Sequence, residues 1–200
     1  DEEFLKMFVN EARLAATLDH PNIVRTYDLV EDAGGFFMVM EYLHGEPLGR
    51  LLNATASAGQ RVPLPHVLTI VLGVAAGLHH AHEARGVDGR PLDIVHRDIS
   101  PGNVFLTEQG GVKLLDFGIA KVAQADEGPG QAQPKTSTDV VMGTPRYMAP
   151  EQCEGRDKVD SKVDVYSLGV RRSGWLPRAG GAAGGRSGRL PGIPTAIPTR

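Results

Sequence analysis

The stretch "IVHRDISPGNVFL", residues 94–106, places an ionisable cluster and an amide between two short apolar runs that predict strands. The cluster is His96, Arg97 and Asp98, and the amide belongs to Asn103. A buried strand pair is ordinarily joined by a short Gly or Asn turn. Catalytic groups often lie on loops held by rigid elements, so this long polar connection favours a functional loop over a solvated loop with an incidental salt bridge.

A second candidate group follows this loop along the chain. After the apolar run come a Gly110-Gly111 turn and "VKLLDFGIA", residues 112–120, which predicts a strand that ends near Asp116. A hairpin of these two strands can bring Asn103 and Asp116 together. Carboxylate and amide oxygens are the ligands that Mg²⁺ prefers, and phosphoryl transfer from a nucleotide also requires a carboxylate to orient the attacking hydroxyl.

The upstream pattern predicts alternating helices and strands. Residues 2–19 have helical spacing, and residues 23–32 and 35–43 are rich in β-branched and aromatic side chains, which predicts a hairpin. Helices are expected from about Pro47 to Ala58 and from about Pro65 to Glu83. The most apolar stretch of the second of these, residues 67–78, has twelve residues, too few to cross a bilayer, so we expect a buried helix.

Composition is that of a soluble globular domain. The 200 residues are 41% hydrophobic and 22% charged, which suits one domain with a sizeable core. The single cysteine, Cys153, excludes an internal disulfide and any multi-cysteine metal site. This fits a reducing compartment, and we expect a cytoplasmic protein.

The last thirty residues differ sharply from the rest. Residues 171–200 contain six Arg, seven Gly and four Pro with no Lys, Asp or Glu, which leaves 15 basic and 24 acidic side chains, a net of −9, in residues 1–170. We expect residues 1–170 to form the domain, the helix to break after Val170, and residues 171–200 to be disordered. A reading-frame shift near Val170 and a genuine basic tail both remain open. Nucleic-acid binding is disfavoured, because Lys is absent and Trp175 is the only aromatic of the tail.

Six motifs, in order over about 170 residues, resemble those of the protein kinase superfamily, specifically the eukaryotic-like serine/threonine kinases of bacteria. The resemblance implies an α+β, kinase-like bilobal fold, incomplete at both ends: a partial N-lobe with one helix and a hairpin, and an incomplete, mainly helical C-lobe. The motifs are "NEARLAATLDHPNIV" (10–24), "FFMVMEYLHGEPL" (36–48), "HRDISPGN" (96–103), "DFG" (116–118), "GTPRYMAPE" (143–151) and "DVYSLG" (164–169).

The resemblance implies roles in phosphorylating protein Ser or Thr with ATP and Mg²⁺. Asp98 would orient the substrate hydroxyl, and Asn103 and Asp116 would hold Mg²⁺. Thr144 would line the substrate-hydroxyl site, since "GTPRYMAPE" favours Ser/Thr over Tyr kinases. Ser100 stands where Ser/Thr kinases usually have a Lys, so stabilisation of the transferred group would be weaker unless another cation substitutes.

The resemblance also assigns a nucleotide site. Glu41 and Leu43 would offer backbone groups to adenine with Met40 behind them, Phe105 would join the same site, and Glu11 would pair with a strand lysine. No glycine-rich loop and no such lysine precede Glu11 in this sequence. We therefore expect the 200-residue chain by itself to be inactive, with a pseudokinase or binding module and a non-functional gene fragment as the alternatives.

Regulation and partners follow from the same resemblance. Arg97 beside Asp98 is typical of kinases in which a cation awaits a phosphorylated loop. In "KTSTDVVMGT", residues 135–144, Thr138 and then Thr136 are the expected phosphosites. The expected partner is a protein substrate with Ser or Thr; neither a nucleic acid nor a membrane segment is expected.

Overall fold

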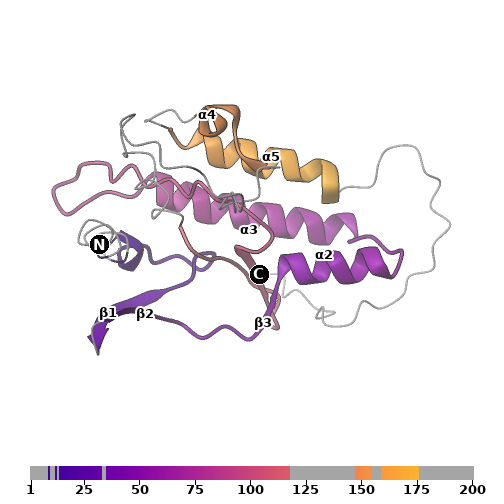
Figure 1. Ribbon diagram of the computed structural model, residues 1–200, viewed down its shortest axis with the longest axis horizontal. Coiled ribbons are helices and arrows are strands. Elements are labelled where there is room, and N and C mark those ends of the chain that lie inside the picture. Colours follow the sequence, from indigo (N-terminus) through magenta and orange to yellow (C-terminus); the bar gives the residue numbers. More distant parts are fainter. Residues whose placement is uncertain are drawn as a thin grey trace, which may run out of the picture.

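The computed structural model describes residues 9, 12, 14–32, 35–117, 147–154 and 159–175. Figure 1 shows the β1–β2 hairpin at one end of the molecule, apart from α2, with α3 running between them and α5 packed along α3. The elements are β1 (Thr26–Asp32), β2 (Gly35–Met40), β3 (Gly45–Pro47), α2 (Leu48–Ser57), α3 (Leu64–His82), β4 (Val104–Thr107), β5 (Val112–Leu114), α4 (Pro150–Cys153) and α5 (Lys162–Trp175).

The expected N-terminal hairpin is confirmed. β1 and β2 pair antiparallel with Leu29 opposite Met38 and Val30 opposite Phe37, and an irregularity falls between Thr26 and Asp28. Residues 14–16 are helical, as the spacing of residues 2–19 predicts. Leu18, just after this turn, is 2% exposed and packs in the main core.

A second sheet carries the loop of interest. It has the order β3-β4-β5 with both pairs antiparallel, so the predicted hairpin over the Gly110-Gly111 turn is confirmed. Residue Ile23 adds a parallel bridge to Leu114 of β5. The segment that precedes the first hairpin therefore lies against the second one.

The first apolar run of the quoted stretch is not a strand, contrary to the sequence-based expectation. Ile94 and Val95 are 4% and 9% exposed but lie in irregular backbone. Ile94 joins the main core, whereas Val95 packs with Ala149 and Val163 in a separate cluster. Two adjacent residues that enter different clusters bury their side chains without a ladder partner, so apolar character alone does not require a strand here.

The predicted helices are confirmed, with bounds shifted by a few residues. α3 has 19 residues with a mean hydropathy of 1.4 in its most apolar window. By length and composition alone this is enough to cross a membrane, so the twelve-residue stretch underestimated the apolar length of the helix. One side of α3 is buried in the protein core, whereas Leu64, Leu68 and Leu72 of the same helix are exposed. The buried residues are Val67, Ile70, Val74, Gly77, Leu78 and Ala81.

The last helix corrects the expected boundary at Val170. α5 continues to Trp175, two residues before Pro177. Arg and Ser at positions 171–173 are compatible with a helix, and one Gly costs only about 1 kcal/mol, so Gly174 does not end it. Residues 176–200, the rest of the tail that was expected to be disordered, lie outside the described residues.

Gly45 provides a test of the β3–β4 pairing. Its φ is +148°, and a Cβ there would lie 2.0 Å from the carbonyl oxygen of Leu106 on β4. We expect Gly45→Ala to lower the free energy of unfolding by about 3 kcal/mol, from clash and backbone strain together, measured by urea denaturation. Gly59→Ala is the control: φ is +64° there with no heavy atom within 4 Å of the added carbon, so about 1 kcal/mol is expected. Equal losses in the two variants would contradict the clash.

Candidate active site

The loop between Val95 and β4 is closed by the side chain of Asn103. The Nδ2 group donates to the backbone oxygen of Asp98 at 2.9 Å and to its carboxylate Oδ2 at 3.0 Å. The backbone of Asn103 donates to the oxygen of Ser100 at 2.8 Å, which makes the loop a tight turn. These bonds fix the direction of one carboxylate oxygen of Asp98 relative to β4.

The second candidate group lies at the open end of the same hairpin. The backbone of Leu115, next to Asp116, donates to the oxygen of Asn103 at 2.9 Å, so the expected meeting of the two hairpin ends is confirmed. Asp116 has φ +40°, a left-handed conformation that is uncommon for a residue other than glycine. Strained backbone of this kind is often found at functional sites.

Two oxygen groups at this end suit a hard cation. Among the residues that the structure describes, neither the Asp116 carboxylate nor Oδ1 of Asn103 has a hydrogen-bond or ion-pair partner, and Asp116 is exposed. One carboxylate and one amide oxygen, both left available by the local bonds, are ligands of the type that Mg²⁺ takes. The pair therefore fits the cation expected from the sequence.

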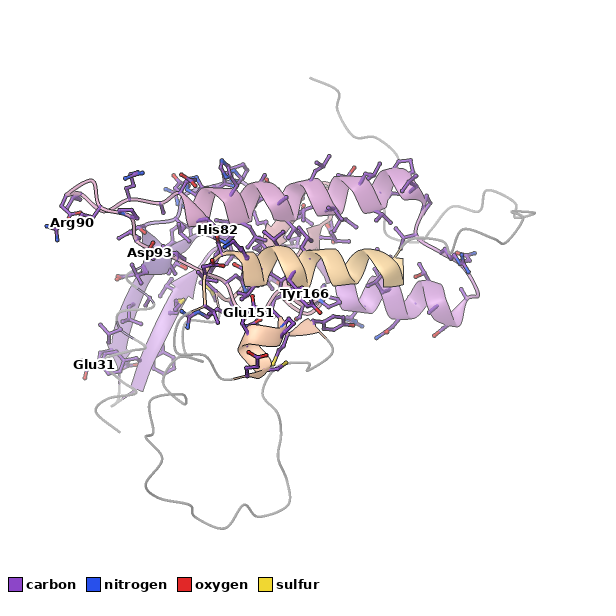
Figure 2. The ribbon with its side chains drawn as sticks, turned by 90° about the horizontal axis from the view of Figure 1, so that it is seen from above. Glu31, His82, Arg90, Asp93, Glu151 and Tyr166 are labelled. Carbon is purple, nitrogen blue, oxygen red and sulfur yellow. The ribbon has the colours of Figure 1, made fainter. Side chains whose placement is uncertain are left out.

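Asp164, in the first turn of α5, anchors the loop from behind. Its side chain is fully buried and accepts the backbone N–H of His96 at 2.8 Å and that of Arg97 at 2.7 Å. His82 of α3 adds a third contact, Nε2 to Oδ2 at 2.8 Å (Figure 2). A buried carboxylate is stable only when its oxygens are hydrogen-bonded, so Asp164 and the loop hold each other in place.

His96 links the loop to the hairpin. It is fully buried, its Nε2 lies 2.9 Å from the oxygen of Leu115, and its ring packs on Phe117 with centroids 4.7 Å apart. The backbone N–H of Asp98 donates to its Nδ1 at 3.3 Å. Burial lowers the pKa of His96, outweighing the nearby Asp164 carboxylate. The neutral ring therefore donates at Nε2 and accepts at Nδ1.

The connection from β2 to β3 carries the expected nucleotide residues. Met40 ends β2, Glu41 and Leu43 follow in irregular backbone, and Phe105 lies on β4 opposite both Pro47 and Lys113. Glu41 also makes an ion pair with Lys113 of β5, which sequence reasoning missed.

The Glu41–Lys113 pair is substantially buried, with side chains 21% and 18% exposed. Burial acts to raise the pKa of Glu41, but hydrogen bonds from Lys113 and from the backbone of Arg25, with the charges of both residues, hold it below its ordinary value. The carboxylate therefore ties the end of β2 to the strand that leads to Asp116.

Several expected site residues lie elsewhere or outside the described residues. Ser100 lies in the turn between Asp98 and Asn103 and is partly buried. Asp164 and Gln152 are structural anchors that the sequence reasoning missed, although both lie in or next to its motifs. The available signal for Asp164 was a carboxylate placed between Val163 and Val165 in a helix. Outside the described residues lie Glu11, Thr136, Thr138 and Thr144.

Comparison with known proteins gives one consistent result. The family model described as protein kinase domain matches residues 1–172. The chain is 47% identical over 168 residues to the tyrosine-protein kinase MasK of Myxococcus xanthus, covering 84% of this chain and 25% of that protein. It is 40% identical over 192 residues to the serine/threonine-protein kinase PknA of Mycobacterium tuberculosis, covering 92% of this chain and 40% of that protein.

The fold has solved counterparts as well. The crystal structure of the kinase domain of Mycobacterium tuberculosis PknI matches with a TM-score of 0.58 at 32% identity, covering 84% of this chain and 54% of that chain. The chain thus spans less than half the length of these two curated relatives and about half of the solved domain.

Titration of His96 tests whether its neutral ring links the loop to the hairpin, through Leu115. Because its pKa is lowered in the folded protein, the unfolded chain binds a proton below about pH 6.5 while the folded one does not. Stability is therefore complete above pH 6.5 and falls on acidification, by up to about 1.4 kcal/mol per pH unit. We expect urea unfolding between pH 7 and pH 5 to show a steeper loss in the wild type than in His96→Phe.

Comparing the pH dependence of stability in the two proteins cancels the contribution of His20, whose pKa is also shifted. Burial, with the charges of His80 and Lys113, also lowers the pKa of His20, and this group is present in both proteins. The same slope in the wild type and in His96→Phe would show that His96 is not held neutral.

Proposed function

We propose that this chain, which belongs to the protein kinase family, serves the ATP-dependent phosphorylation of Ser and Thr hydroxyls in proteins. The observation that carries the proposal is the closed loop in which Asn103 holds the Asp98 carboxylate. Leu115, the residue before Asp116, bonds to the backbone of Asn103 and so brings Asp116 to the same end of the hairpin. The likeness to PknA supports a Ser or Thr acceptor.

Each described residue has a definite task in this reaction. Asp98 accepts or orients the proton of the attacking hydroxyl, and the Asn103 amide holds its other oxygen so that the carboxylate does not rotate. Oδ1 of Asn103 and the carboxylate of Asp116 would hold Mg²⁺, which would supply positive charge to neutralise the nucleotide phosphates. Positioning of these groups contributes most of the acceleration in phosphoryl transfer.

A tyrosine acceptor is the second candidate. It is favoured by the likeness to MasK, which is named a tyrosine-protein kinase, and by Ser100, which supplies a hydroxyl where Ser/Thr kinases usually have a lysine. The motif "GTPRYMAPE" favours Ser or Thr. A protein that binds nucleotide without turnover is the remaining alternative, and an activity measurement separates it from both.

The proposed reaction can be measured directly. We expect the full-length protein that carries this sequence to transfer label from Mg²⁺-ATP to a generic protein substrate, with label found on Ser and Thr by phosphoamino-acid analysis. Asp98→Asn and Asp116→Asn should each lower the rate by at least about 100-fold, because one removes the base and the other a cation ligand. Label on Tyr alone would establish the second candidate, and binding of nucleotide without any label would establish the third.

The second prediction concerns activation. Arg97 is partly buried beside Asp98, and its guanidinium has no hydrogen-bond or ion-pair partner in the described part of the chain. A phosphate on the loop can pair with this cation and order the segment. We expect mass spectrometry of the active protein to find phosphate on Thr138 and then Thr136, and Thr138→Ala to lower kcat about tenfold, about 1.4 kcal/mol.

Ser57→Ala, at an exposed position of α2, is the matched control and should leave kcat unchanged. Active protein that carries phosphate on neither threonine would contradict this prediction.

A further inference from the structure

Gln152 joins two segments of the site through the two ends of its side-chain amide. It lies on α4, in the segment Tyr147–Cys153, and its Oε1 accepts the backbone N–H of Ala149 at 3.1 Å. Its Nε2 donates to the backbone oxygen of Arg97 at 2.9 Å. One end therefore caps the short helix, while the other reaches the loop that carries Asp98.

The carbonyl that Gln152 holds belongs to the peptide group just before the proposed base. The peptide between Arg97 and Asp98 is planar, so fixing its C=O and its N–H fixes the direction in which the Asp98 Cα leaves the loop. Its N–H donates to Nδ1 of His96 at 3.3 Å, a longer contact than the bond from Gln152. The bond from Gln152 is thus shorter than the contact with His96.

The restraint matters because Arg97 is in an unfavourable conformation. Its φ is +63°, left-handed, which costs about 1 kcal/mol for a residue with a Cβ. Asp164 accepts the backbone N–H of Arg97 at 2.7 Å and so fixes the peptide group before Arg97. The rotation that remains is that of the peptide group after Arg97. Without a partner for its carbonyl, this peptide can turn toward a lower-energy backbone and carry Asp98 with it.

The segment that carries Gln152 is docked on the same helix as the loop. Ser167 of α5 donates from Oγ to the oxygen of Tyr147 at 2.7 Å. Ala149 is fully buried against Val95 and Val163. α5 therefore places both partners of the bridge, the loop through Asp164 and the segment through Ser167.

We propose that Gln152 is a positioning residue for Asp98: while Asn103 holds the carboxylate, the bond of Gln152 to the Arg97 carbonyl fixes the peptide before Asp98 in its working orientation only while the segment Tyr147–Cys153 is docked on α5. Docking of this segment and alignment of the base become one event. The inference rests on the proposed function, because it gives Asp98 the role of base.

The test is the isosteric change Gln152→Glu in the full-length protein. Glutamate keeps an oxygen for the Ala149 N–H, so the helix cap survives, but it places a second oxygen against the Arg97 carbonyl in place of a donor. We expect kcat to fall about tenfold or more, KM for ATP to stay within about twofold, and the Tm to change little. Amide exchange followed by NMR should show the Asp98 N–H exchanging about tenfold faster.

Cys153→Ser is the matched control, one residue along the same helix and exposed, and it should match the wild type in every measurement. Unchanged kcat and unchanged exchange at Asp98 in Gln152→Glu would overturn the inference. So would faster exchange throughout the fold with a lower Tm, which would show a general structural role. A wild type without activity would refute the proposed function, while the exchange of Asp98 would still decide whether Gln152 holds this peptide.

Discussion

The carboxylate of Asp164 is the constraint on which the site depends. It has no exposed surface, and it accepts hydrogen bonds from two consecutive backbone amides, those of His96 and Arg97, and contacts His82. A buried charge left without such partners costs several kcal/mol, so α5 cannot pack against α3 unless the loop takes this path. The next torsion along the chain, φ of Arg97, is left-handed at +63°. Two of the protein kinase motifs, residues 96–103 and 164–169, are thus joined directly by the hydrogen bonds of Asp164.

A second network holds the hairpin from the opposite side. The backbone N–H of Val24 donates to the oxygen of Leu114 at 2.8 Å, and the N–H of Leu114 donates to the oxygen of Asn22 at 2.8 Å. The Asn22 side chain donates to the oxygen of Val112 at 2.8 Å. The ion pair of Glu41 and Lys113 closes the network at the end of β2. β5 is therefore fixed to the segment before β1 and, through Glu41, to the connection after β2, and Asp116 lies two residues beyond the end of β5. The proposed nucleotide region and the proposed cation ligands share one hydrogen-bonded unit.

The parts of the fold that the sequence predicts well are those with a local cause. The apolar run of α3 and the strand-forming residues around the turns of both hairpins depend on neighbours a few positions away, and these elements were confirmed. The errors have non-local causes. Ile94 and Val95 have the composition of a strand but enter two clusters, and β3 is three residues whose only signal is its pairing with β4. The helix was expected to break at the change of composition after Val170, although Arg and Ser are compatible with a helix and α5 continues to Trp175.

The candidate site divides in the same way. From the sequence alone come the chemical groups and their order: the carboxylate of Asp98, the amide of Asn103 five residues later and the carboxylate of Asp116, whose meeting follows from a hairpin that local turn residues encode. Only the tertiary structure decides which side chains hold these groups in place. Asp164 lies 67 residues from the amide of Arg97, and Gln152 lies 55 residues from its carbonyl. Such bonds form because separate elements pack together and bury polar groups that must then find a partner, and no local pattern in the chain specifies which partner that is.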